Sequence, residues 1–200
     1  MIKSNAQESG KAGDATRQRI VDAALETLKH EGFAGATSRA IARRGGFNQA
    51  LIFYHFGSLD SLLLAALDRT SSERLKQYRA AVEQAETLEE LVELLVRARG
   101  QDRETGHTAV VVQMIAGSVA RPELAPQIVA RMEEWVDLAQ QALAKVVARL
   151  PFPVELPLRD LAYAACTFEL GANLLTHLDE GRRIDALLGQ LERLLRDLAS

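Results

Sequence analysis

The side chains best suited to direct chemistry gather in a short stretch between positions 37 and 55. Gln49 can pair with the N6 and N7 edge of an adenine, and Ala50 or Phe53 can touch the methyl group of a thymine. Hydroxyl, guanidinium and imidazole groups in the same stretch suit phosphate oxygens, which fix the register of a protein on DNA without reading bases. The stretch therefore indicates DNA recognition through eight candidate residues: Thr37, Arg39, Asn48, Gln49, Ala50, Phe53, Tyr54 and His55.

Two short helices must hold these side chains. Thr37 can cap a helix over 38–44, and Asn48 can cap a second one over 49–55. An amphipathic helix over 16–32, with apolar residues at helical spacing, precedes them. Two short helices joined by a glycine-containing turn and packed on a third form a helix-turn-helix, whose last helix enters the major groove. This arrangement would bring the N-terminal end of the second short helix to the base edges.

Residues 16–64 resemble the N-terminal module of the tetracycline-repressor (TetR) family. The likeness lies in the spacing of an Ala-Ala pair, a Glu-Gly-Phe, a Thr, an Ile-Ala and a Gly, followed by a Tyr-His-Phe box and a leucine-rich helix. It implies a transcriptional regulator with a C-terminal helical domain that binds a ligand and dimerises, and it assigns the same eight residues to DNA contacts. The chain departs from the family at Phe53, where Tyr is usual, and at Leu59, where a phosphate-binding Lys often stands.

The charge distribution fits a basic module on an acidic body. Residues 1–56 carry eight Lys or Arg against five Asp or Glu, whereas the remainder carries 16 against 22. This division is expected when a phosphate-binding module is attached to a domain that does not bind nucleic acid.

The remainder of the chain is predicted to be helical. A fourth helix begins near Leu59, and five more are expected, at 88–100, 107–120, 124–149, 157–179 and 183–199. The Val110-Val111-Val112 run favours a strand, but no second strand is available to pair with it. The fold class predicted is therefore all-α.

Three parts of the chain are distinguished. Residues 1–13 have no hydrophobic period and are expected to form a disordered arm. Residues 14–57 are expected to form the three-helix DNA-binding module, and residues 58–200 the helical bundle that binds a ligand and dimerises. The small core of the module is predicted to consist of Phe33, Ile41, Phe47, Ile52 and Phe56.

Segment 157–179 predicts a second subunit. It is apolar on nearly all sides, and a helix buried all round needs partners on both sides. In the TetR family the last two long helices pair with their symmetry mates, and 157–179 and 183–199 match that pattern. Small residues would permit the close crossing of two such helices: Ala162, Ala164, Ala165, Gly171 and Ala172.

A ligand cavity is expected between the middle helices. Its candidate contacts are polar side chains within apolar runs and their apolar neighbours: Gln113, Met114, Trp135, Cys166, Thr167, Phe168 and Asn173. Each has a plain structural alternative; Trp135 can be part of the core, and Cys166 can behave as a small hydrophobe. Glu169 is a further candidate unless it faces the dimer partner.

Catalytic motifs are absent from the sequence. The histidines are scattered, and no His-Glu-x-x-His, Walker loop, G-x-G-x-x-G or G-x-S-x-G pattern occurs. A single cysteine, Cys166, excludes an intramolecular disulfide and any metal site built from several cysteines. We expect no enzyme activity, no metal or cofactor, no export signal or membrane segment, and a cytoplasmic location.

Three functions follow from these patterns. The leading one is a homodimeric repressor that binds double-stranded operator DNA and leaves it when a small, largely apolar effector binds. The second is a helical-bundle carrier or enzyme whose N-terminal module no longer binds DNA, and the third is a regulator without a small-molecule effector. DNA binding separates the second from the others, and a ligand-dependent shift in melting temperature separates the third from the first.

Overall fold

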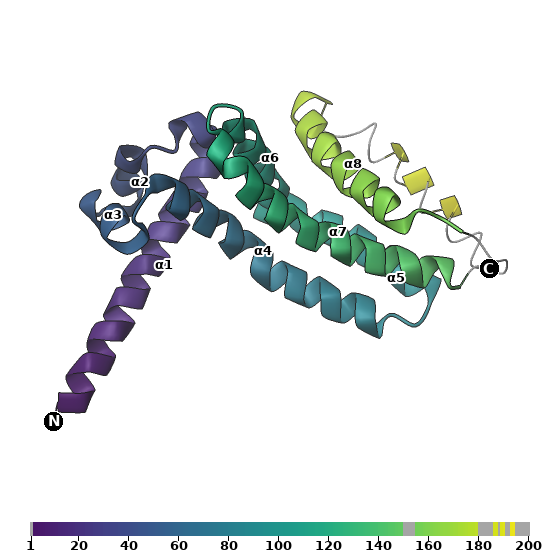
Figure 1. Cartoon of the computed structure of the whole chain (residues 1–200). Helices are drawn as coiled ribbons and strands as arrows, with labels where there is room; N and C mark the ends of the chain where they lie inside the picture. Colours follow the sequence, from purple (N-terminus) through teal and green to yellow (C-terminus); the bar gives the residue numbers. More distant parts are fainter. Residues whose placement is uncertain (1, 150–154, 180–185, 188, 191–192, 195–200) are drawn as a thin grey trace.

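The computed structural model describes residues 2–149, 155–179, 186–187, 189–190 and 193–194. In this part of the chain all regular secondary structure is helical, as predicted, and the described residues of segment 183–199 are helical as well. The elements are α1 (Ile2–Gly35), α2 (Ser38–Gly45), α3 (Ala50–Phe56), α4 (Leu59–Gln84), α5 (Leu88–Thr105), α6 (His107–Ser118), a short 3₁₀ turn η1 (Pro122–Leu124), α7 (Ala125–Val147) and α8 (Leu158–Asp179) (Figure 1).

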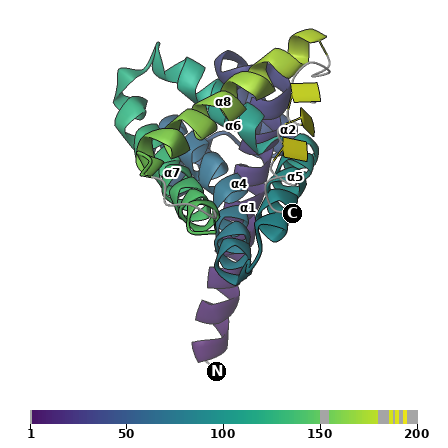
Figure 2. The same cartoon turned by 90° about the vertical axis from the view of Figure 1, so that its right-hand side faces the viewer.

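A small module lies at one end of the molecule, and a bundle of longer helices extends from it (Figure 1). Helices α1, α2 and α3 form the module, and α4 leads from it into the bundle. Figure 2, turned by 90°, shows α7 and α5 on either side of α4, with α8 lying across them. Helix α6 packs against α1 of the module and against α8 of the bundle, so it joins the two parts.

Local signals in the sequence define the ends of the module's helices. Thr37 Oγ1 accepts a hydrogen bond from the backbone N–H of Ala40 at 3.2 Å, which caps α2. Asn48 was predicted to cap the next helix, but α3 begins at Ala50 and its N-cap is Gln49, which makes no side-chain capping bond. Asn48 lies one residue earlier, and its Oδ1 accepts from the N–H of Ala50 at 2.9 Å. Gly32 adopts a φ of 68°, a conformation that favours glycine, and interrupts α1 before its last turn.

The N-terminal arm differs from the prediction. Residues 2–13, expected to be disordered, continue α1 as helix, and Figure 1 shows this end projecting away from the body. The segment contains Ala, Lys, Gln and Glu, which have high helix propensity. Extending a helix that already exists avoids the cost of nucleation, so weak local propensity suffices to prolong α1.

Helix α5 also extends beyond its predicted end. Gly100 was expected to terminate it, but the helix continues to Thr105 and ends at Gly106, which has a φ of 69°. Inside a helix a glycine costs only about 1 kcal/mol relative to alanine. The start of α5 is firmly defined by a capping box in which Thr87 and Glu90 bond each other's backbone N–H groups. One glycine is therefore too weak a signal to end this helix.

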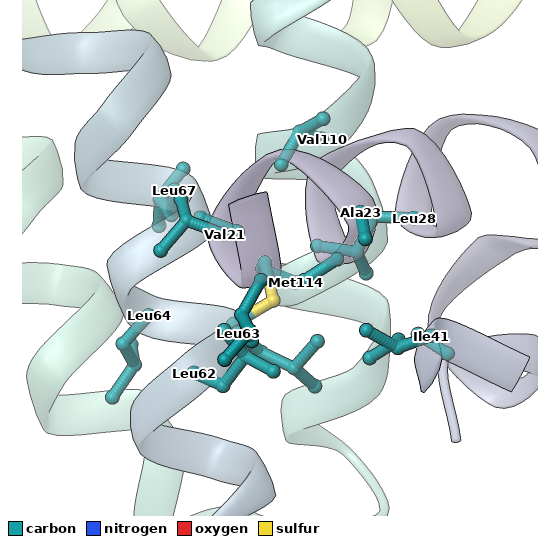
Figure 3. Packing of buried hydrophobic residues seen from close by; sticks show 14 of the residues in the cluster. Val21, Ala23, Leu28, Ile41, Leu62, Leu63, Leu64, Leu67, Val110 and Met114 are labelled. Carbon is teal, nitrogen blue, oxygen red and sulfur yellow. The ribbon is translucent and has the colours of Figure 1, made fainter. Parts of the chain in front are cut away.

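One of two buried apolar clusters among the described residues runs from the module into the bundle (Figure 3). Leu28 of α1 and Ile41 of α2 pack in the same cluster as Leu62 of α4 and Met114 of α6, and each of the four is fully buried. The predicted module core is confirmed, since Ile41 and Ile52 are fully buried and Phe33, Phe47 and Phe56 pack against the same cluster. The division at residues 57 and 58 stays a prediction about function, because the apolar packing crosses it.

Among the described residues, no single helix is long and apolar enough to span a bilayer. Helices α3 and α4 reach the required length and apolar character only together, and they are bent by 71° relative to each other.

Candidate DNA interface and ligand cavity

Helix α3 presents an exposed face at the end of the molecule farthest from α5 (Figure 1). Ile52 is fully buried and anchors the helix, whereas Asn48, Gln49 and Ala50 at its N-terminal end are exposed. Aromatic side chains normally lie inside a protein, yet 82% of Tyr54 is exposed. An anchored helix with exposed polar and aromatic side chains at its tip has the form required to enter a groove.

The remaining predicted DNA contacts lie beside this face. Phe53 is half exposed, and the His55 ring packs edge-on against Tyr54 with 5.0 Å between the ring centroids. Thr37 and Arg39 are exposed at the N-terminal end of α2. Because the Thr37 hydroxyl accepts its capping bond, its own proton stays available for a phosphate oxygen.

Two further arginines lie close to this surface and were missed by the sequence patterns. The guanidinium of Arg17 lies 4.8 Å from the ring centroid of Phe56, and that of Arg19 lies 6.0 Å from Phe47. Both arginine side chains are exposed, so they add positive charge beside the module. Arg44, in contrast, pairs with Glu31 at 2.8 Å, and this bond satisfies part of its charge within the module.

A cavity of about 630 Å³ lies within the bundle. Its wall is mostly apolar and is supplied by five helices, α4 to α8. Three predicted contacts line it, Trp135, Cys166 and Phe168, and Glu169 lines it as well. Its size lies within the range of about 300–1,000 Å³ that is usual for small-molecule sites.

The structure does not bring three other candidates to this cavity. Gln113 is turned toward the module, where its Oε1 accepts a hydrogen bond from the N–H of Phe33 at 3.1 Å. Met114 is fully buried in the shared core, and Thr167 is exposed. Asn173 belongs to α8, but its side chain lies outside the described residues. The sequence alone could not show which face of α6 lines the cavity and which packs against the module, because both faces are covered by protein.

Residues 20–66 match the model of the bacterial regulatory proteins of the tetR family. The match assigns this N-terminal module, and not the rest of the chain, to the tetR family. The matched segment contains α2, α3 and the start of α4, and hence the exposed face described above.

Relatives of the chain are transcriptional regulators by name. The HTH-type transcriptional regulator UidR of Escherichia coli strain K12 is 26% identical over 113 residues, which are 56% of this chain and 57% of UidR. The HTH-type transcriptional regulator BetI of Brucella canis is 31% identical over 80 residues, which are 40% of either chain. The chain therefore spans about half the length of these relatives.

Solved structures share the fold across nearly the whole chain. A TetR-family transcriptional regulator from Cytophaga hutchinsonii has a TM-score of 0.73 at 16% identity, and 94% of this chain and 96% of that chain are covered. The fatty acid degradation regulator FadR from Bacillus halodurans has a TM-score of 0.74 at 19% identity, with 90% and 93% covered. Both likenesses extend through the C-terminal bundle and establish its fold.

One corner of the cavity is polar. Arg74 on α4 donates from Nη1 to Asp102 Oδ1 on α5 at 2.9 Å, and the N–H of Thr108 donates to the same oxygen at 3.0 Å. His107, at the start of α6, lies beside the Trp135 ring with 5.1 Å between the centroids. Sequence reasoning missed Arg74, Asp102 and His107 because charged residues in long helices usually face water.

Burial and charge keep His107 neutral. Only 5% of this residue is exposed. Loss of hydration disfavours the imidazolium, the positive charge of Arg74 acts in the same direction, and the carboxylate of Asp102 opposes both. The net effect lowers the pKa of His107 from 6.5 to about 4.

Stability is therefore expected to fall as the pH drops below neutral. The unfolded chain protonates residue 107 near pH 6.5, whereas the folded chain does not until about pH 4. Because the unfolded state binds more protons in this window, the unfolding free energy should fall by about 2 kcal/mol between about pH 7.5 and pH 5. Urea titrations of the parent chain and of His107→Phe would measure this, and the variant should lose less stability over the same range. An identical pH dependence in the two proteins would contradict the assignment.

Cys166 is not activated for chemistry. Burial raises the pKa of its thiol, and the negative charge of Glu169 raises it further. A thiol that stays protonated at neutral pH is a weak nucleophile, so Cys166 serves as an apolar part of the cavity wall.

Charged and polar contacts join the cavity to the module. Arg131, which lines the cavity on α7, donates two hydrogen bonds to Asp68 on α4, one of them 2.8 Å long from Nη2 to Oδ2. Arg121, after α6, pairs with Asp60 in the first turn of α4. Asp60 follows α3 closely in the chain, so this ion pair lies next to the exposed face of the module.

Proposed function

We propose that this chain is a DNA-binding transcriptional repressor that leaves its operator when a small, largely apolar molecule fills the cavity. The observation that supports this most directly is the exposed tip of α3, which is anchored by the buried Ile52 within a tetR-family module. Such a regulator acts in the cytoplasm, beside the DNA that it controls.

The eight candidate residues divide into two roles in this proposal. Asn48, Gln49, Ala50 and Phe53 face the bases, where Gln49 reads adenine through N6 and N7. The others hold phosphates and fix the register: Thr37, Arg39, Tyr54 and His55.

Two substitutions test these roles on a DNA site selected by the protein from a random pool. Gln49→Ala should weaken binding to that site by about 1–3 kcal/mol and relax the preference at one base pair in each half-site. Arg39→Ala should weaken binding to selected and random DNA alike and reduce the slope of log K against log salt by about one unit. Both are measured by fluorescence anisotropy at several salt concentrations.

The outcomes separate reading from positioning. An equal loss on selected and random DNA would remove Gln49 from the readers, and an unchanged salt slope would remove Arg39 from the phosphate contacts. If the parent chain selects no sequence and binds no DNA, the helical-bundle carrier or enzyme is the better description.

In this proposal, DNA is released because filling the cavity changes the position of α3. An occupant that spreads α4 and α7 would strain the Arg131–Asp68 pair and tilt α4, on which the module is mounted. A dimer binds two half-sites about 34–36 Å apart, so a small tilt spoils both contacts at once. A coupling of about 1–3 kcal/mol weakens DNA binding by about 5–150-fold, and by reciprocity DNA weakens effector binding by the same factor.

The second copy of the chain is proposed to cover α8. Leu174 and Leu175 are about half exposed, at 54% and 51%, and they lie one turn beyond the exposed Gly171. A Cβ built on Gly171 would have no neighbour within 4 Å among the described residues, so no contact there requires glycine. A close crossing with the α8 of a second subunit would account both for the small residue and for the exposed leucines.

A further inference from the structure

The polar corner of the cavity contains a hydrogen bond whose direction is assigned from the neighbouring contact. Thr70 has one hydroxyl proton, and its Oγ1 lies 2.8 Å from the carbonyl oxygen of Leu67, which can only accept. We therefore assign the 2.8 Å contact between Thr70 Oγ1 and His107 Nδ1 to donation by the histidine, the arrangement in which both contacts are hydrogen bonds. The ring proton of neutral His107 thus lies on Nδ1, which leaves Nε2 as an acceptor.

This acceptor has no partner in the part of the chain that the structure describes. His107 is 95% buried and lines the cavity. Among the described residues, its imidazole makes one hydrogen bond, which is the one to Thr70. An acceptor that faces a cavity costs free energy when a ligand shields it from water without offering a donor. An occupant that carries a donor removes this cost, whereas a purely apolar one makes it permanent.

The charges around Nε2 favour an uncharged occupant. Among the described residues, Arg74 and Asp102 form an ion pair beside the histidine, so a charge of each sign lies at this corner. A cationic ligand would approach Arg74, and an anionic one would meet Asp102 and the lone pair on Nε2. Trp135 supplies a flat apolar surface next to the imidazole, and most of the remaining wall is aliphatic.

We propose that this cavity takes an uncharged, largely apolar molecule with one hydroxyl or N–H group, which donates its hydrogen bond to His107 Nε2. The inference rests on the proposed function in one respect, that the cavity is the effector site. It adds the chemical class of the effector and the atom that selects it.

Three biphenyl probes test the inference on the full chain at neutral pH. They are 4-hydroxybiphenyl, which has a donor, 4-methoxybiphenyl, which lacks it, and biphenyl-4-carboxylate, which is anionic. Trp135 is the only tryptophan in the chain, so its fluorescence reports occupancy, and calorimetry gives a second readout. The hydroxyl probe should bind about tenfold more tightly than the methoxy probe, and the carboxylate should bind least.

Variants at position 107 separate the acceptor from the general shape of the cavity. The amide nitrogen of His107→Asn can replace Nδ1 as donor to Thr70 but leaves nothing at the Nε2 position, so the preference for the hydroxyl probe should fall below about twofold. His107→Gln carries an oxygen toward the Nε2 position and should keep most of the preference. Met132→Ala, which removes apolar wall, is the matched control and should weaken all three probes alike.

Several outcomes would overturn the inference. They are equal affinities of the hydroxyl and methoxy probes, tightest binding of the carboxylate, a full preference retained in His107→Asn, and no binding of any probe at its solubility limit. The melting temperature of each variant shows whether it folds.

The same probes in the DNA-binding assay distinguish this inference from the proposed function. A hydroxyl preference without release of DNA supports the inference and removes the effector role from the proposed function. Release of DNA by both neutral probes alike supports the effector role and overturns the inference.

Discussion

Replacing Gly117 by leucine is expected to lower the free energy of unfolding by about 3 kcal/mol. Gly117 lies on the face of α6 that packs against Phe33, at the end of α1. A Cβ at this position would lie 2.3 Å from Cγ of the Phe33 ring and 2.4 Å from each Cδ. Real Cβ atoms do not approach so closely, so either the ring or the helix must move.

The Phe33 ring has little freedom to make room. The backbone N–H of Phe33 donates to Oε1 of Gln113, which lies on α6 like Gly117. The guanidinium of Arg121 lies 5.3 Å from the centre of the Phe33 ring. A side chain at 117 would therefore push α6 away from α1 and open the core shared by the module and the bundle. Because α6 also carries His107 and Val111 of the cavity wall, the same change should disturb the cavity.

Gly100→Ala is the matched control for this prediction. A Cβ built on Gly100 has no neighbour within 4 Å among the described residues, and Gly100 lies inside α5 with an ordinary helical φ. Alanine should therefore stabilise the chain by about 0.5–1 kcal/mol through helix propensity. Urea unfolding of the two variants and the parent chain measures both effects, and similar midpoints for Gly117→Leu and the parent would disprove the close contact.

The features predicted correctly from the sequence are those controlled by neighbours along the chain. Thr37 caps α2 because its side-chain oxygen reaches an N–H three residues ahead, and Asn48 bonds the N–H of Ala50 in the turn before α3. Ile41 and Ile52 are buried because the helical period places them opposite the polar side chains. These relations are local, so the module could be assembled from residue order alone.

The cavity depends on relations that residue order does not contain. Arg74 and Asp102 are 28 residues apart, and Thr70 and His107 are 37 apart. Arg74 lies in a charged stretch whose pattern predicts a solvent-exposed face. In the structure α5 and α6 pack against α4, and Arg74 lies in the cavity wall. Similarly, polar Gln113 within an apolar run indicates a special role, but only the fold shows that the role is to hold Phe33.

Leu174→Arg is expected to disrupt the proposed dimer. Leu174 is 54% exposed in one chain and does not line the cavity, so the substitution should leave the folded protomer and its ligand site intact. Buried against the α8 of a second copy, the new charge would lack a partner. An uncompensated buried charge costs about 3–5 kcal/mol.

Such a cost raises the dissociation constant of the dimer by more than about 100-fold. Sedimentation velocity over a range of protein concentrations would therefore show monomers of Leu174→Arg where the parent chain is dimeric. Val119→Arg is the matched control: Val119 is 84% exposed at the C-cap of α6 and does not belong to α8, so the same change there should leave the dimer intact. A monomer holds one half-site, so Leu174→Arg should also lose most of its affinity for a two-half-site DNA while keeping its weak binding to a single half-site. A dimer of Leu174→Arg as stable as that of the parent would place the interface on another face of the bundle.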